Sequence, residues 1–522
     1  MRTLLSMIAL MLTIAVWGQR LKITTSSGTK EYSASQLTSN SPATFTGGTT
    51  MTIGSDVFTI SDITSMLVAS SSSSTVEANT VNIIYNGSSA TVTMDDNVAA
   101  YVTAEVSGAH VSITPSTTAA IDGDEITYVL SGSTTDGSLT LDGSYKCTIS
   151  LDGVTLTNPS GAAIDITNSK RIQLSAKNST VSTLTDSSNG SQKACIYSKG
   201  QLQLQGKGTL NVAGNTKHAI KSGDYISVKN LTLNITKAVG DGINCNEYFL
   251  MKSGAISISG VGDEGIQCDL DGDVSTGETT DHEDEDSGNI YIEGGTLFVN
   301  AATEGIESKG ELRITGGEVT VNAKDDAINA AGDLTISGGY VYARSTGNDG
   351  IDANGNCYIK GGVVYAIGSG SPEVAIDANS EQQKKLYVTG GTIIAIGGLE
   401  SGASLTQSCY QASSWSKNTW YAMTVGSDTF VFQTPYSGGS TMVVSGASEP
   451  TLLSSVTVSS GTSIFDGLGY TNATIIGGSS VSLSSYTGGG NPGGGGGPGG
   501  GGQPGGGGQP GGGGGPGGGG WH

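Results

Sequence analysis

Acidic residues recur in this chain at fixed positions of a repeat, and carboxylates spaced in this way can bind divalent cations. Five consecutive repeats carry Asp or Glu two residues before an isoleucine, and further acids lie one residue after it or three before it. Calcium prefers about six to eight oxygen ligands, mostly from carboxylates and carbonyls. The pattern therefore predicts calcium ions between neighbouring repeats. The candidate ligands are Asp241, Asp263, Glu264, Glu304, Glu307, Asp325, Asp326, Asp349, Asp352 and Asp377.

The same acids have a simpler interpretation as solvated turn residues, because turn geometry favours Asp. Like charges in neighbouring repeats repel one another and shift each other's pKa unless a cation lies between them. We therefore favour calcium and keep the solvated edge as the alternative. The earlier repeats carry His218 and Lys221 at these positions and are not expected to bind calcium.

The isoleucine that these acids flank marks a repeating fold. It follows a small residue nine times, at steps of 24, 23 and 23 residues from Ile196 to Ile266, then 40, then 22, 23 and 25 up to Ile376. A fixed period of this length is typical of a solenoid, in which each repeat is one coil stacked on the last. The long step coincides with an acidic insertion at 269–287.

One repeat, residues 305–326, divides into three short strands. The first begins at Ile306, the second covers 311–315, and the third covers 318–322 after a Gly-Gly corner. Apolar residues alternate with polar ones in the second and third strands, which is the period of β structure. Three strands and tight corners in 22–23 residues predict an all-β parallel β-helix. The Gly-Gly corner keeps the same period, at 294–295, 316–317, 338–339, 361–362 and 390–391.

Aromatic residues on the third strand suggest a second binding surface. Flat rings in a row on a rigid face suit stacking on sugar rings, and an arginine can pair with a uronate carboxylate. The alternatives are a ladder that only stabilises neighbouring strands, or a row hidden under the C-terminal segment. The candidate carbohydrate-binding residues are Phe298, Tyr340, Tyr342, Arg344 and Tyr365.

Composition restricts the class of protein. The 522 residues carry a net charge of −22, which disfavours nucleic acid and anionic lipid as partners and favours cations. The six cysteines form no CxxC pair or Cys/His cluster, so a zinc site is not expected. We expect buried thiols, with a bridge between Cys245 and Cys268 as the alternative.

The chain divides into five parts. Residues 1–18 have the positive start and short apolar run of a secretory signal, so we expect a secreted or cell-surface protein. No later stretch is long enough to span a membrane. A small β module with a Ser-rich linker is expected over 20–79, the β-helix over 80–400, a β cap over 401–486, and a Gly/Pro/Gln-rich tail without a core over 487–522.

Several motifs in order carry a family resemblance: Lys193–Gly200 (KACIYSKG), Gly206–Leu210 (GKGTL), Lys217–Lys221 (KHAIK) and Asp241–Asn244 (DGIN). Over about 80–480 the chain resembles exported β-helical carbohydrate-binding domain proteins whose coils are like those of polysaccharide lyases. The resemblance implies a right-handed β-helix, calcium held between coils by Asp and Glu, and binding of plant cell-wall polymers such as polygalacturonate and cellulose.

The leading hypothesis is therefore a monomeric, non-catalytic, calcium-dependent polysaccharide-binding protein. The second is a calcium-dependent pectate lyase, whose chemistry needs a base to remove a proton from the sugar. Lys324 is the best-placed candidate base, although its neighbours Asp325 and Asp326 favour a salt-bridged structural role. The third is a passive surface stalk or adhesin. No Ser/His/Asp arrangement or phosphate loop is present in the sequence.

Overall fold

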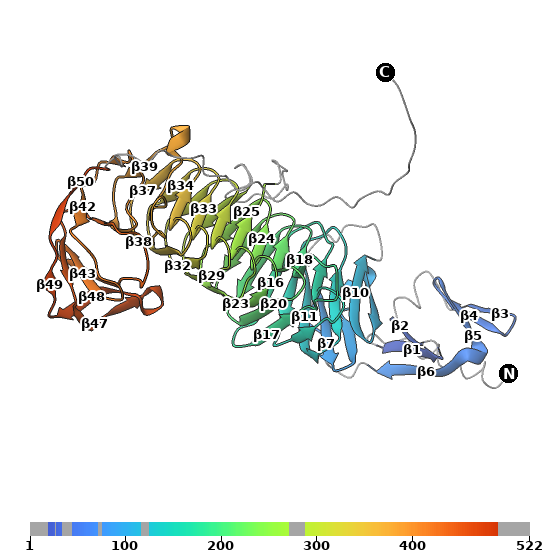
Figure 1. The fold of residues 1–522 in the computed structure, drawn as a ribbon. Coiled ribbons are helices and arrows are strands. Elements are labelled where there is room, and N and C mark those ends of the chain that lie inside the picture. The colour runs from blue at the N-terminus through green and yellow to red at the C-terminus, as the bar shows by residue number, and fades with distance from the viewer. Residues whose placement is uncertain are drawn as a thin grey trace, which may run out of the picture.

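A computed structural model describes residues 19–26, 28–33, 44–70, 76–115, 125–270 and 288–488. These residues form strands and short 3-10 turns without an α-helix, and none of their helices is long and apolar enough to cross a membrane. Figure 1 shows a rod of stacked coils with a small β unit at its N-terminal end and a β-sheet at its C-terminal end. The rod has about ten coils, which confirms the predicted parallel β-helix. The predicted signal, nearly all of the acidic insertion and nearly all of the tail lie outside the described residues.

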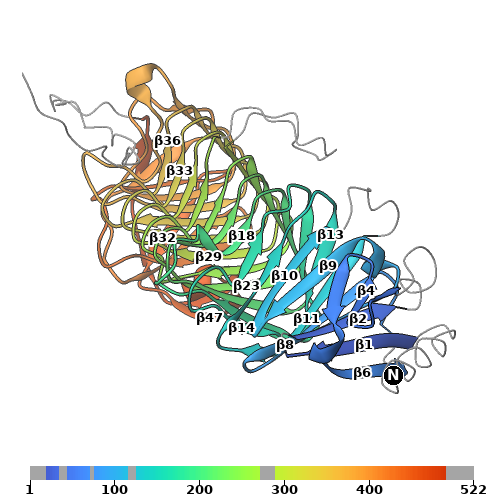
Figure 2. The same cartoon turned by 90° about the vertical axis from the view of Figure 1, so that its right-hand side faces the viewer.

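The first strands of successive coils up to Ile351 join in one sheet, and Figure 2 shows these strands side by side along the rod. The repeat isoleucines pair in exact succession there: Ile266 aligns with Ile306 across the insertion, just as Ile306 aligns with Ile328. The insertion therefore leaves the rod without shifting its register. The strands of this sheet are β12 (Gly137–Leu141), β15 (Ile164–Ile166), β18 (Ala194–Ser198), β21 (His218–Ser222), β24 (Ile243–Cys245), β27 (Ile266–Cys268), β30 (Ile306–Ser308), β33 (Ile328–Ala330) and β36 (Ile351–Ala353).

The second and third strands of the coils alternate inward apolar and outward polar residues, as predicted. Glycine is required at the corner between them, because Gly317 has φ +85° and a Cβ there would lie 2.8 Å from the Gly295 carbonyl oxygen. The second strands are β11 (Ile126–Thr134), β13 (Cys147–Leu151), β16 (Ile172–Ala176), β19 (Leu202–Gly206), β22 (Ile226–Lys229), β25 (Tyr248–Met251), β28 (Asn289–Ile292), β31 (Leu312–Ile314), β34 (Leu334–Ile336), β37 (Cys357–Ile359), β39 (Leu386–Val388) and β41 (Ser404–Leu405). The third strands are β14 (Thr155–Thr157), β17 (Val181–Thr185), β20 (Thr209–Gly214), β23 (Leu231–Ala238), β26 (Gly254–Ile258), β29 (Thr296–Asn300), β32 (Glu318–Ala323), β35 (Tyr340–Ser345), β38 (Val363–Ile367) and β40 (Thr392–Ile396).

The core of the rod is one continuous cluster of inward side chains. The repeat isoleucines are fully buried. Stacked one above another, they form a column of side chains that excludes water along the rod. All six cysteines are free and buried, as expected. The sulfur atoms of Cys245 and Cys268 lie 3.4 Å apart in neighbouring coils.

The N-terminal end of the rod is closed by short antiparallel strands. β9 (Val102–Ser107) pairs antiparallel with β10 (Ala109–Pro115), which continues the first-strand sheet, and β8 (Ser89–Met94) pairs with β7 (Thr80–Asn86). The separate lead-in unit consists of β1 (Gln19–Thr25), β2 (Gly28–Ser33), β3 (Thr44–Thr46), β4 (Thr50–Ile53), β5 (Asp56–Thr59) and β6 (Ile63–Ser70). The 3-10 turns of this region are η1 (Ile60–Asp62) and η2 (Val98–Ala100).

The C-terminal segment forms a sheet module on the last coils. β45 (Met442–Ser445) pairs antiparallel with the third strand β40, and β42 (Cys409–Ala412) joins β45 to β50 (Leu483–Tyr486). This pairing covers a strand edge that would otherwise be open to another chain. A six-stranded antiparallel sheet completes the module: β43 (Trp420–Val425), β44 (Asp428–Gln433), β46 (Thr451–Ser454), β47 (Thr457–Ile464), β48 (Gly469–Ile476) and β49 (Ser479–Ser480). The turns are η3 (Ser380–Gln382) and η4 (Phe465–Gly467).

Truncating one column isoleucine tests the packing of the rod. Ile328 is fully buried, so Ile328→Ala removes apolar contacts with the coils on both sides. We expect it to lower the free energy of unfolding by about 2–5 kcal/mol, measured by urea denaturation. Thr335→Ala, on the outward face of β34, is the control and should change that free energy by about 0.5 kcal/mol or less. Equal effects of the two substitutions would contradict a packed isoleucine column.

Candidate functional site

The acidic residues of the repeat gather along one edge of the rod. The acid two residues before each isoleucine lies in the turn that enters the first strand, and the acid one residue after it lies on the outward side of that strand. Because the strands stack in register, a residue at one position of the repeat lies beside its equivalent in the next coil, as Asn329 lies between Glu307 and Asp352. Asp241, Glu264, Asp326 and Asp349 are each less than a tenth exposed. Burial of this kind is costly for a carboxylate that has no compensating partner.

Asp241, Asp263 and Glu264 form the first cluster, with one carboxylate oxygen from each lying within 4.8 Å of the others. Asp241 and Glu264 are buried and Asp263 is exposed. Burial and the Asp241 charge raise the pKa of Glu264 to about 10. Burial would also raise the pKa of Asp241, but contacts with His218 and Asn244 outweigh it and lower that pKa. Without a cation, the cluster therefore keeps a proton on Glu264 at neutral pH.

Asp349, Asp352 and Asp377 form the second cluster, with ligand oxygens that also lie within 4.8 Å of one another. Burial, followed by contact with Glu400, raises the pKa of Asp377 to about 11. Burial is also the largest cause for Asp349 and Asp352, whose pKa values rise to about 8 and about 6. Asp352 and Asp377 remain partly exposed, so this cluster opens to solvent.

The other four predicted ligands lie outside these two clusters but on the same edge. Burial and the charge of Glu307 raise the pKa of Glu304. Burial and the charges of the second cluster raise the pKa of Asp326 to about 8. Glu307 forms an ion pair with Lys309, and exposed Asp325 accepts a hydrogen bond from Asn348 at 2.8 Å. None of these four acids belongs to a group of three carboxylates with oxygens within 4.8 Å of one another in the described residues, so they are weaker candidates for a metal.

At the position one residue after the repeat isoleucine, some coils carry an amide in place of an acid, and this amide lies beside acids of neighbouring residues or coils. Asn329 Nδ2 donates to carboxylate oxygens of Asp326 and Asp352 at 3.1 and 3.2 Å, and Gln267 Nε2 donates to Glu307 at 2.6 Å. Each amide gives the acids beside it a neutral donor in place of a second charge. The crowding therefore remains where acids meet directly in neighbouring coils.

Glu400 belongs to the second cluster electrostatically and was missed by the sequence interpretation. It follows Leu399, which pairs with Ile376 as the next member of the isoleucine column. The sequence feature that could have identified Glu400 is a tenth repeat, 23 residues after Ile376, in which Leu replaces the isoleucine. Glu373 also acts on this cluster, since its charge raises the pKa values of Asp349 and Asp352.

The donor set of both clusters fits calcium. All candidate ligands are carboxylate oxygens, the hard donors that calcium prefers, and two oxygens bound to one calcium ion at about 2.4 Å lie at most about 4.8 Å apart. The spacing within each cluster meets this limit. A cation would also replace the protons that crowding now holds on the buried acids. In the early coils the Lys221 ammonium contacts Asn244 and Asn246, and the expectation that these coils do not bind calcium stays a prediction.

The predicted aromatic strip is largely covered by the C-terminal module, as one of the alternatives held. Tyr342 and Tyr365 are at most 3% exposed, and their rings contact Phe465 and Phe432. The prediction that these two rings stack on sugars is therefore wrong, since neither has a free face. The module is a long-range feature that the local strand pattern does not reveal.

The remaining members of the strip have different surroundings. Arg344 lies over the Tyr436 ring, at 5.3 Å from its centroid, and two of its nitrogen atoms are buried without a hydrogen bond. Phe298 lines a cavity of about 390 Å³ beside Asp466. Tyr340 lines a larger cleft of about 560 Å³. Of the five predicted residues, Phe298 and Tyr340 therefore keep access to open space.

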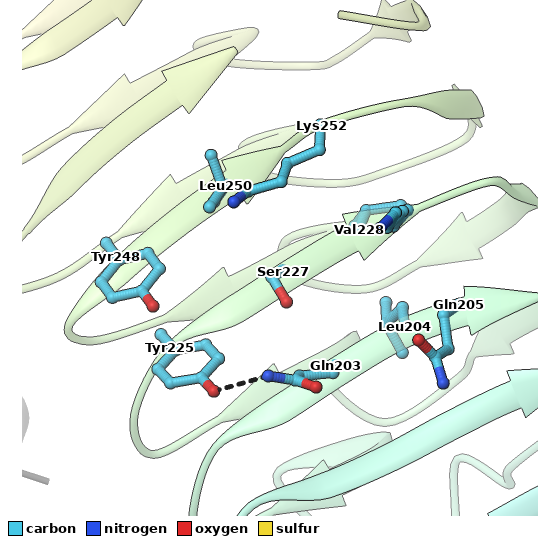
Figure 3. Close-up of a pocket in the computed structure, with 10 residues that line it drawn as sticks. Gln203, Leu204, Gln205, Tyr225, Ser227, Val228, Tyr248, Leu250 and Lys252 are labelled. Atoms are coloured by element: carbon cyan, nitrogen blue, oxygen red, sulfur yellow. Dashed lines mark hydrogen bonds between the residues drawn. The ribbon is translucent and has the colours of Figure 1, made fainter. Parts of the chain in front are cut away.

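Another pocket lies on the outward face of the second strands, where no site was predicted. Figure 3 shows Tyr225 and Tyr248 one above the other, with the Tyr225 hydroxyl bonded to Gln203 at 2.9 Å. The two rings stack at 4.7 Å and both are almost fully buried. The available sequence signal was a tyrosine at the same position of two successive coils, one residue before the aligned Ile226 and Phe249. Because the rings cover each other, we do not place sugar stacking on them.

The candidate base Lys324 is exposed. Within the described residues no carboxylate lies at ion-pair distance from it, so the structural salt bridge expected from its acidic neighbours is not formed there. It carries no feature that singles it out as a base.

Comparison with known proteins assigns the sequence to a family. A sequence model of the carbohydrate-binding domain-containing protein family matches residues 107–306 and 286–438. The chain belongs to this family. The matched region covers most of the rod, both acidic clusters and part of the C-terminal module.

Two relatives illustrate how far the similarity extends. A carbohydrate-binding domain-containing protein from Acetivibrio thermocellus is 26% identical over 111 residues, which is 19% of this chain and 39% of that protein. The chain thus spans well under half the length of that curated relative. A polysaccharide lyase-like protein from C. thermocellum, solved as a gadolinium derivative, is 20% identical with a TM-score of 0.37, covering 59% of this chain and 97% of its own.

The raised pKa values predict how stability depends on pH. The folded clusters hold protons that the unfolded chain releases above about pH 4, so in EDTA the melting temperature should fall as the pH rises from 5 to 9. Added calcium should reduce this fall, because the ion replaces the protons. Differential scanning calorimetry at several pH values with and without calcium measures both effects. A melting temperature that rises with pH in EDTA would contradict the crowded clusters.

Proposed function

We propose that this protein is an exported, monomeric, non-catalytic polysaccharide-binding protein that uses calcium to bind acidic plant cell-wall glycans of the polygalacturonate type, with cellulose as a further ligand. The observation that carries the proposal is the match to a carbohydrate-binding domain family over most of the rod and part of the C-terminal module. The binding of glycans by this chain rests on that membership.

The two acidic clusters support the role of calcium. Asp241, Asp263 and Glu264 would hold one ion, and Asp349, Asp352 and Asp377 would hold another. Bound calcium would supply positive charge between coils whose carboxylates otherwise repel one another. Because the second cluster is partly exposed, an ion there could accept a further oxygen ligand from outside the protein.

Net charge supports a cation bridge to an acidic glycan. A chain with a charge of −22 repels a polyuronate at long range. A calcium ion held by the partly exposed carboxylates Asp352 and Asp377 would reverse the charge locally. A uronate carboxylate could then bind through the ion, without an arginine or lysine at the site.

Neutralising one acid in each cluster tests the calcium sites. In the wild-type protein we expect calcium to raise the melting temperature, and Glu264→Gln or Asp377→Asn should reduce that rise. In EDTA the same substitutions should leave the protein about as stable as the wild type, because each replaces a carboxyl group that already holds a proton with a neutral amide. Asp152→Asn, which removes an exposed ion pair with Lys177, is the control and should keep the full calcium response. A wild-type melting temperature that calcium leaves unchanged would exclude both sites.

Incubation with polygalacturonate separates binding from lyase chemistry. We expect the protein to be retained on the polymer in calcium, to be released by EDTA, and to generate no ultraviolet absorbance from unsaturated products. Lys324→Ala should not change retention, because that side chain lies outside both clusters. Accumulation of unsaturated products would overturn the non-catalytic proposal, and a loss of those products in Lys324→Ala would establish the lyase alternative.

A further inference from the structure

A cleft of about 560 Å³ lies between the last coils and the C-terminal module. The coils contribute the start of three successive third strands and the Gly-Gly corners before them. The module contributes the β43–β44 hairpin, the segment Ala447–Ser448 and part of β48. The cleft is separate from the acidic edge, which lies at the turn before the first strand.

The floor of the cleft is bare because its corners cannot carry side chains. Gly362 has φ +80°, and a Cβ there would lie 2.8 Å from the Gly339 carbonyl oxygen of the previous coil. Beside this floor Tyr340, Val363 and Thr392 align in register and are each partly exposed. The coils therefore offer one aromatic ring beside a flat strip of backbone.

The opposite wall is polar at its rim and apolar at its base. Ser427 and Asp428 lie exposed at the tip of the hairpin, and Asn472 is exposed on β48. Met423 and Phe430, which are buried, close the base. The Tyr340 hydroxyl has no hydrogen bond to any described residue, so it is available to a ligand.

The lining has the chemistry of a site for uncharged sugars. An aromatic ring packs against the C–H face of a sugar, and amide, hydroxyl and carboxylate groups bond to its hydroxyls. Among the described lining residues Asp428 is the only charged side chain, and no lysine or arginine is present. A uronate would meet this carboxylate without a balancing cation, whereas a neutral sugar can donate hydroxyl hydrogens to it.

We propose that this cleft binds an oligosaccharide of neutral sugars, with a sugar ring against Tyr340 and hydroxyls bonded to Asp428 and Asn472. The assignment rests on the proposed polysaccharide-binding function. It adds a second binding site, which prefers neutral sugars, to the acidic edge proposed to bind acidic glycans through calcium. The cleft exists only where the module lies against the coils, so the module supplies specificity as well as closing the rod.

Calorimetric titration of the full chain tests the assignment. The probes are cellohexaose, mannohexaose and xylohexaose as neutral sugars, and hexagalacturonate in calcium as the acidic one. We expect at least one neutral hexasaccharide to bind, and Tyr340→Ala to weaken its affinity about tenfold through loss of the ring contact. Ser427→Trp, at an exposed turn, should block the cleft without disturbing the core. Hexagalacturonate binding should be unchanged in both variants.

Tyr358→Ala is the matched control, because Tyr358 is an accessible tyrosine on another strand, stacked on Tyr387 at 5.0 Å. It should leave neutral-sugar affinity unchanged, and melting temperatures should show that all variants fold. The assignment of neutral-sugar binding to the cleft would be wrong if binding survives in both Tyr340→Ala and Ser427→Trp. It would also be wrong if Tyr358→Ala lowers the affinity as much as Tyr340→Ala does. If hexagalacturonate binds and none of the neutral hexasaccharides does, the assignment of the cleft is wrong but the proposed function stands. Binding of no polysaccharide or oligosaccharide at all would overturn the proposed function itself.

Discussion

The in-register stacking of coils is the constraint on which this structure depends. Backbone hydrogen bonds between parallel strands hold neighbouring coils about 4.8 Å apart, so a residue at one position of the repeat lies beside its equivalent in the next coil. A buried isoleucine at that position builds a continuous core, whereas a buried acid builds a column of like charges. The same geometry thus produces both the stability of the rod and its main electrostatic conflict.

The protein relieves this conflict in different ways along one edge. Asn329 and Gln267 place amides between acids, Lys309 pairs with Glu307, and His218 stabilises the charge of Asp241. Each of these contacts gives a carboxylate a hydrogen-bond donor within the protein in place of a second negative charge. Where acids meet directly, as in Asp349, Asp352 and Asp377, burial and mutual repulsion leave protons on groups that would otherwise ionise. Such a group can exchange its proton for a cation, and the two clusters differ from the rest of the described edge because three carboxylate oxygens lie within 4.8 Å of one another there.

The periodic part of the sequence predicted most of this arrangement. The isoleucine period identified residues that pair across the first sheet, even over the 40-residue step, because a parallel β-helix converts sequence period directly into spatial contact. Six of the ten predicted ligands meet in the two clusters. Glu400 was missed because Leu399 replaces the expected isoleucine. The burial of Tyr342 and Tyr365 could not be read from the repeat, since antiparallel strands far along the chain cover them.

That covering module changes what the aromatic strip can do. On an isolated rod, Tyr340, Tyr342 and Tyr365 would form a row of exposed rings. The module instead uses two of them as its own hydrophobic contact and leaves Tyr340 at the mouth of a cleft. The acidic edge and this cleft lie at different corners of the coil, so they can differ in charge preference without competing for space. A strongly acidic chain can attract a polyanion only through a bound cation, whereas a neutral sugar needs none. In the proposed function, calcium dependence would therefore belong to the edge, and selection by shape and hydrogen bonding would belong to the cleft.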